Sequence, residues 1–151
     1  MRLVASYGLG FLLAVLWFDL MFDVQVRPHR SERDLPDAVL TSIASYYRRV
    51  TTDARPMNQL VALAMLTTLG SLIGEVVGNP PHRIAGGVAL AFAGSAISIA
   101  GARTVRNAVR LGWRADATTQ QSALARSIYH DHCACLLLVV VALVAHMVVA
   151  S

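Results

Sequence analysis

One long apolar run opens the sequence, LVASYGLGFLLAVLWFDLMFDVQV at residues 3–26. The hydrocarbon core of a bilayer is roughly 30 Å thick and takes about 20 helical residues to cross, so this run is long enough. Three further runs have the same character, at residues 56–77, 83–102 and 123–149. Together they predict an all-α integral membrane protein, a single domain of four transmembrane helices in 151 residues.

Composition supports a membrane protein and argues against a nucleic-acid-binding one. Hydrophobic residues make up 56% of the chain and charged residues only 15%, whereas a soluble domain carries about 25% charged residues. The net charge is +4, but the basic residues flank the apolar runs, which is where membrane proteins place them. We therefore expect the lipid bilayer as a partner and no nucleic acid.

The arginines predict an orientation. Eleven of the thirteen fall in or beside the first and third loops, and only Arg2 and Arg83 lie on the opposite side. Because cytoplasmic loops carry the excess of basic residues, we expect both of these loops in the cytoplasm. Both termini would then be periplasmic or extracellular, in a multi-pass protein of the inner (plasma) membrane.

The first loop contains a helical pattern of its own, at about residues 36–50. Its apolar residues recur at helical spacing, and Tyr46, Tyr47, Arg48 and Arg49 follow them. Aromatic rings at headgroup level and guanidiniums near phosphate are typical of a helix that lies in the membrane interface. We expect an amphipathic interfacial helix here, with a plain solvated helix as the alternative.

Small residues predict close helix packing in the third run. One row at four-residue steps consists of Gly87, Ala91 and Ser95, and a second of Gly94, Ser98 and Ala102. Such rows allow backbones to approach closely in lipid. They predict a central helix or one at the interface of a homo-oligomer or a larger membrane complex.

Ionisable residues inside the apolar runs need partners, because an unpaired charge in hydrocarbon is costly. Asp19 and Asp23 share one face of the first helix, and Arg27 follows four residues later. One interpretation is a local pair of Asp23 with Arg27 that anchors the helix. The other makes both aspartates ligands or acid–base groups. Glu75 and His146 lie at the outer level and are expected to pair.

The fourth run begins with the polar sequence YHDHC at residues 129–133, which looks like a metal-binding motif. On a helix, however, His130 and His132 point about 200° apart and cannot hold one ion together. Other helices would have to complete a site, so the candidate metal ligands are Asp19, Asp23 and His130. The alternative is a polar network at the cytoplasmic end that fixes the helix register.

The order of these features resembles the anthrone oxygenase-like family of small four-helix membrane proteins. Four segments carry the resemblance: Val26-Arg27-Pro28-His29, Ser45-Tyr46-Tyr47-Arg48-Arg49, Pro56-Met57-Asn58-Gln59 and Arg126-Ser127-Ile128-Tyr129-His130. The resemblance implies oxidation of a lipophilic aromatic or quinone-like molecule that arrives from the lipid. By their chemistry, His130 is the candidate base, and Asn58 and Arg126 are candidates to stabilise an oxyanion, with Asp19 beside them.

Three functions follow from these features. The first is an accessory or assembly subunit of a larger membrane complex, favoured by the small size and the small-residue rows. The second is a membrane oxidoreductase or oxygenase that acts on a lipophilic small molecule. The third is a small transporter, based on the carboxylates Asp19, Asp23 and Glu75. The residues do not specify a cofactor.

Overall fold

The computed structural model describes residues 2–78 and 83–150, without the side chains of residues 55, 149 and 150. Every element within these ranges is helical. The elements in chain order are α1 (Arg2–Asp23), η1 (Val24–His29), α2 (Asp37–Arg48), η2 (Arg49–Asp53), α3 (Arg55–Gly78), α4 (Arg83–Ile99), η4 (Ala100–Thr104), α5 (Val105–Trp113) and α6 (Thr118–Ala150).

Four helical stretches are long and apolar enough to cross a membrane, as the sequence predicts. They span Arg2–His29, Pro56–Gly78, Arg83–Trp113 and Thr118–Val148. The third is longer than expected, because α4 continues through the wide π-helical turn η4 into α5 and does not end at residue 102. The fourth begins at residue 118, earlier than the expected 123.

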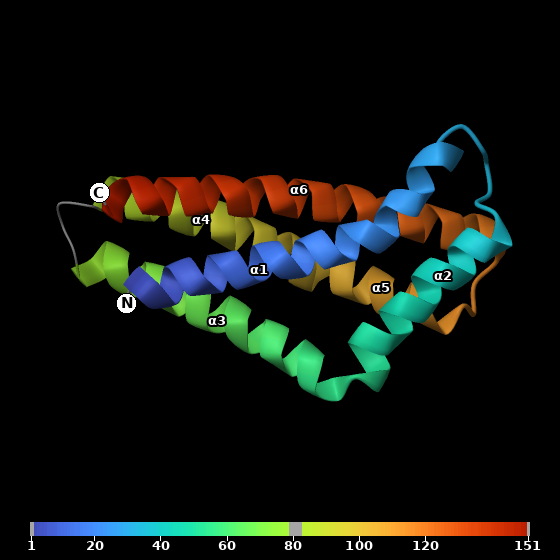
Figure 1. Cartoon of the computed structure of the whole chain (residues 1–151), viewed down its shortest axis with the longest axis horizontal. Coiled ribbons are helices and arrows are strands. Elements are labelled where there is room, and N and C mark those ends of the chain that lie inside the picture. The colour runs from blue at the N-terminus through green and yellow to red at the C-terminus, as the bar shows by residue number, and fades with distance from the viewer. Residues whose placement is uncertain (1, 79–82, 151) are drawn as a thin grey trace.

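The long helices α1, α3, α4 and α6 lie side by side along the long axis of the molecule (Figure 1). Both chain termini lie at one end of this bundle, and α2 crosses the other end. There α3 diverges from α1, whereas the two helices are close near the termini (Figure 1). We call the end that carries α2 the α2 end.

An apolar core fills the bundle near the termini. Small side chains of α4 are central to it, because Ala89 and Ala93 are completely buried against residues of α1, α3 and α6. The buried row of α4 is Gly86, Ala89, Ala93 and Ala96. The two rows expected from the sequence are different ones, and most of their members, such as Ala91 and Ser95, are exposed. Close packing within the chain therefore uses the neighbouring face of the helix.

A second apolar core lies at the α2 end, where α2 packs on α5 and α6. Leu40, Ile43 and Tyr47 of α2 are buried against Leu111 of α5 and Ile128 of α6. The apolar face of α2 is thus covered by the protein itself. Tyr47 points inward and is only 2% exposed, so its ring is covered by the protein and is not presented to the surroundings.

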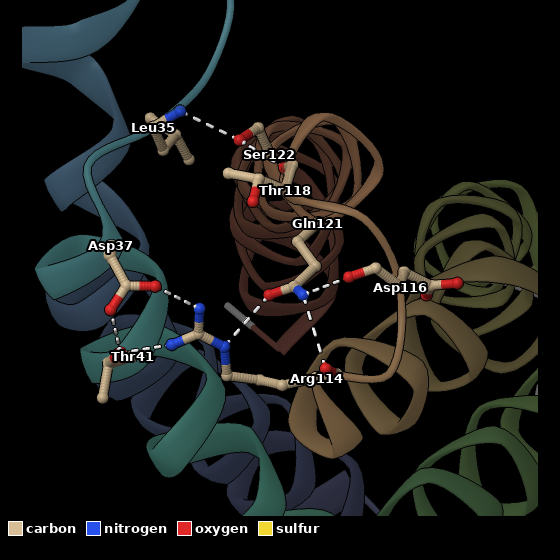
Figure 2. A network of polar contacts seen from close by, with 8 residues as sticks. All are labelled: Leu35, Asp37, Thr41, Arg114, Asp116, Thr118, Gln121 and Ser122. Atoms are coloured by element: carbon tan, nitrogen blue, oxygen red, sulfur yellow. Dashed lines mark hydrogen bonds and ion pairs between the residues drawn. The ribbon is translucent and has the colours of Figure 1, made fainter.

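Polar contacts fix the beginning of α2 to the connection between α5 and α6 (Figure 2). Arg114 follows α5 in a left-handed conformation, with φ of 50°. Its guanidinium donates to Asp37 Oδ1 at 2.6 Å, to Thr41 and to Gln121 Oε1 at 3.1 Å. Nearby, the backbone N–H of Leu35 donates to Ser122 Oγ at 2.9 Å. These contacts hold α2 in the position from which its tyrosines reach α1.

Candidate functional site

A large apolar cavity lies at the α2 end of the bundle. Its volume is about 780 Å³, and its walls come from α1 to α6 with the turns η2 and η4. It is situated where α3 diverges from α1, and the buried side chains of α3, Thr68, Ser71 and Leu72, all lie in the half beyond the cavity. The beginning of α3 therefore forms a wall of the cavity and does not pack against the other helices.

Polar side chains gather at one side of this apolar cavity. Asp19 of α1, Tyr46 and Tyr47 of α2, and His132 and Cys135 of α6 all line it. Asp23 lies directly behind them and is completely buried. We call Asp19, Asp23, Tyr46, Tyr47 and His132 the carboxylate–histidine cluster.

His132 is held between two carboxylates. Its Nδ1 lies 2.6 Å from Asp23 Oδ2, and its Nε2 lies 3.7 Å from Asp19 Oδ2. The short contact requires a proton on Nδ1 when the imidazole is neutral, because an ionised carboxylate only accepts. That proton placement leaves the lone pair on Nε2, the nitrogen that faces Asp19. Nε2 has no hydrogen bond to any side chain or backbone group of the described residues.

Two tyrosines hold the carboxylates. Tyr47 donates to Asp23 Oδ1 at 2.6 Å, so both oxygens of this buried carboxylate have partners. Tyr46 donates to Asp19 Oδ1 at 2.7 Å and stacks on Phe22, with ring centroids 4.0 Å apart. Burial, together with the nearby carboxylates, raises the pKa of both phenols far above their usual range. Both tyrosines therefore remain neutral donors.

A separate ion pair lies beside Thr104, which is one of the residues that line the cavity. Asp131 of α6 is buried and accepts from the Arg103 guanidinium, with Nε at 2.9 Å, and from Thr104 Oγ1 at 3.2 Å. Arg103 and Thr104 belong to η4, and such π-helical turns often mark functional sites. Because Asp131 is neutralised in this way, it is not available to His132 as a further acceptor.

The structure brings some of the sequence candidates together and separates others. Asp19 and Asn58 both line the cavity, and the Asn58 amide donates to the Thr51 carbonyl at 3.0 Å. His130 is exposed on the opposite side of α6, and Arg126 donates to backbone carbonyls of the first loop. The carboxylates of α1 therefore face His132 and not His130.

The expected local pair of Asp23 with Arg27 is also replaced. Asp23 uses both oxygens on Tyr47 and His132, which approach from other helices. The expected pair at the terminal end is confirmed, because His146 Nδ1 lies 3.4 Å from Glu75 Oε2. Polar groups deep in a bundle thus find their partners across helices.

The predicted metal ligands Asp19, Asp23 and His130 do not converge. Within residues 2–78 and 83–150, no three His, Cys, Asp or Glu side chains are arranged to hold a metal ion. The oxygens of Asp23 are occupied by protein donors. Cys133 and Cys135 are both free thiols.

A heptad pattern in the sequence could have identified His132. One row of buried residues on α6 follows alternating steps of three and four, which is typical of a helix face packed in a bundle. We call this row the α6 seam, and it consists of Ala125, Ile128, His132, Cys135, Val139, Ala142 and His146. Asp19 and Asp23 occupy the corresponding row of α1, with Ala5, Leu9, Leu12, Leu16 and Val26.

Comparison with protein-family models, curated proteins and solved structures finds no match for this chain.

Proposed function

We propose that this protein is a membrane enzyme that binds a lipophilic aromatic molecule carrying a hydroxyl group, and that His132 accepts the hydroxyl proton. The observation that carries the proposal is the position of His132 Nε2. This nitrogen belongs to a buried imidazole that Asp23 orients through the other ring nitrogen, and His132 lines a cavity of about 780 Å³ whose walls are mostly apolar. Ligand sites have this character, with a few placed polar groups in an apolar pocket.

The cavity walls support entry from the lipid. Phe11, Phe18 and Met57 line the cavity, and their side chains are also 39%, 60% and 49% exposed. These residues lie on α1 and α3, the two helices that diverge at the α2 end (Figure 1). The apolar surface is therefore continuous from the outside of the bundle to the cavity, which suits a substrate dissolved in the membrane.

The proposed step is a proton transfer. The substrate O–H bond breaks, its proton moves to His132 Nε2, and the electron pair stays on the substrate oxygen as a phenolate. The imidazolium is then stabilised by Asp23 on one side and Asp19 on the other, 2.6 Å and 3.7 Å away. The second N–H of the Asn58 amide is our candidate donor to the phenolate. In an oxygenase, dioxygen would then be the oxidant that consumes this phenolate.

The phenol 1-naphthol tests this proposal, because its neutral and ionised forms differ in ground-state absorbance. The purified protein in lipid nanodiscs should bind it and increase the naphtholate fraction at neutral pH. The His132→Asn variant keeps a donor for Asp23 but lacks the base, so bound naphthol should stay neutral. His29→Gln, a histidine outside the cavity, serves as the control and should behave as the wild type.

Binding itself is tested by filling the cavity. Val61 of α3 lines the cavity, whereas Leu63 on the same helix is 56% exposed and does not. Val61→Trp should weaken 1-naphthol binding by about tenfold or more, because the indole ring would take up cavity volume that the ligand needs, and Leu63→Trp should not. Equal binding by both variants, or a naphtholate signal that survives His132→Asn, would sink the proposal.

An accessory or assembly subunit is the second candidate function, and one observation favours it. Ala91, Ser95, Ser98 and Ala102 form an outward row of small, exposed residues on α4 and η4. Such a row permits close approach of another transmembrane helix. Extraction in a mild detergent followed by native mass measurement tests this: a stable heteromeric complex is expected, and Ala91→Leu with Ser95→Leu should dissociate it.

A further inference from the structure

A second cavity lies at the α2 end and shares no lining residue with the first. Its volume is about 490 Å³, and it is situated between the turn η1, which ends the first span, and the first half of α6. Its lining residues are Val26, Arg27, Pro28, Arg30, Arg126, Tyr129 and His130.

The polar part of this cavity is entirely basic or neutral. Three guanidiniums, of Arg27, Arg30 and Arg126, and the imidazole of His130 contribute to it, and the lining includes no Asp or Glu among the described residues. Two carboxylates nearby in the sequence are engaged elsewhere: Glu32 pairs with His29 at 2.8 Å, and Asp23 belongs to the carboxylate–histidine cluster. Like charges gathered in one hollow repel one another unless an anion is bound there.

Arg126 is positioned by the protein and has a donor to spare. Its two terminal nitrogens donate to the carbonyl oxygens of His29, Glu32 and Arg33, at 3.2, 2.7 and 3.0 Å. Its Nε is buried and has no hydrogen-bond partner among the described residues. A buried N–H without a partner is rare in proteins and calls for an explanation, which a bound anion would supply.

The remaining walls suggest the kind of anion. Val26, Pro28 and the ring of Tyr129 are apolar surfaces beside the guanidiniums. Guanidiniums match the oxygens of phosphate in charge and in planar geometry. A phosphate group attached to an apolar body, at the end of a membrane span, satisfies both parts of the cavity.

We propose that this second cavity binds a phosphate group, with Arg126 as the fixed donor and with Arg27 and Arg30 as the exposed cations that close over it. A phospholipid headgroup and free phosphate share this chemistry. The site is independent of the proton-transfer site, because the two cavities have no lining residue in common.

Binding measurements on delipidated protein in detergent test the proposal. One arm adds phosphatidic acid in mixed micelles, with phosphatidylcholine as the neutral-headgroup comparison, and the second adds inorganic phosphate. Arg27→Gln with Arg30→Gln should weaken phosphatidic acid binding by about tenfold or more, in proportion to the charge removed. Arg106→Gln serves as the matched control, since Arg106 is an exposed arginine on α5 away from the cavity, and it should change nothing.

The two arms separate the sources of the phosphate. If the double variant loses phosphatidic acid binding and the wild type does not bind inorganic phosphate, the ligand is a lipid headgroup. Inorganic phosphate binding that the same variant loses identifies a free phosphate ligand. Arg126→Gln should have the same effect as the double variant if the protein remains folded. Binding of both probes that is equal in the wild type and in the Arg27 and Arg30 double variant would overturn the proposal, as would no binding of either probe.

Discussion

At the scale of residues, Tyr47 is the member of the carboxylate–histidine cluster whose loss should cost the most stability. Its hydroxyl is the donor to one oxygen of Asp23, and both side chains are buried. Without that donor, a carboxylate oxygen would be left unpaired in an apolar interior. Such losses cost about 1–3 kcal/mol.

Tyr47→Phe should therefore lower the free energy of unfolding by about 1–3 kcal/mol. Tyr46→Phe should cost less, because its partner Asp19 is 14% exposed and can be solvated in part. Thermal unfolding in nanodiscs, with each variant compared with the wild type, measures the difference. The explanation fails if Tyr46→Phe is the more damaging of the two.

The contact between Arg114 and Asp37 predicts a dependence on pH. The Arg114 guanidinium lowers the pKa of Asp37 below its ordinary value of 3.8. A carboxyl with a lowered folded-state pKa stabilises the fold above its ordinary pKa, and this contribution disappears as the pH falls through the lowered value. Asp37→Asn should therefore lower the Tm at neutral pH, and the difference from the wild type should shrink as the pH falls below 3.8 and vanish below the lowered pKa. Asp34→Asn, on the preceding exposed loop, should show no such dependence.

At the scale of elements, the contact between α1 and α3 depends on one glycine. A Cβ added at Gly8 would lie 2.0 Å from Thr68 Oγ1, and Thr68 is buried with its hydroxyl bonded to the Ala64 carbonyl. Gly10, two residues later, has open space around it. The two positions form a natural pair for testing whether α3 is held at its terminal half.

Gly8→Ala should destabilise the bundle by about 1–3 kcal/mol, the usual cost of forcing extra atoms into a packed contact. Gly10→Ala should be neutral or slightly stabilising, because alanine is the better helix former. The comparison between the two variants uses the fraction of protein that remains folded in detergent and the Tm. Combining Gly8→Ala with Thr68→Ala should restore part of the loss, and equal effects of the two single glycine variants would contradict the close contact.

The sequence predicts some elements of the structure better than others. Span number and the apolar face of α2 follow from hydropathy and helical spacing, because those patterns depend only on local residues. The partners of Asp19 and Asp23 cannot be predicted from local spacing. The i,i+4 spacing points to Arg27, whereas the actual partners come from α2 and α6. The expectation of His130 in place of His132 has the same origin: residues two apart on a helix point to different faces, and only the α6 seam shows which face is buried.

At the scale of the whole molecule, charge is divided between the two ends. The α2 end carries the first and third loops with eleven arginines, and Arg2 and Arg83 belong to the opposite end. We propose on this ground that the α2 end is cytoplasmic and that both termini lie outside. In a bacterial host, alkaline phosphatase fused after Ser151 should be active and green fluorescent protein fused there should be dark. The reverse pattern would invert this proposed topology.

The central claim is that His132 Nε2 accepts a proton from a lipophilic hydroxyl in the apolar cavity. Nitrogen NMR of protein labelled with ¹⁵N-histidine tests it most directly, since protonated and unprotonated ring nitrogens resonate far apart. On adding 1-naphthol, the Nε2 signal assigned to His132 should move from the unprotonated to the protonated range, and 1-methoxynaphthalene, which has no proton to give, should leave it in place. A His132 signal that 1-naphthol does not change would contradict the account.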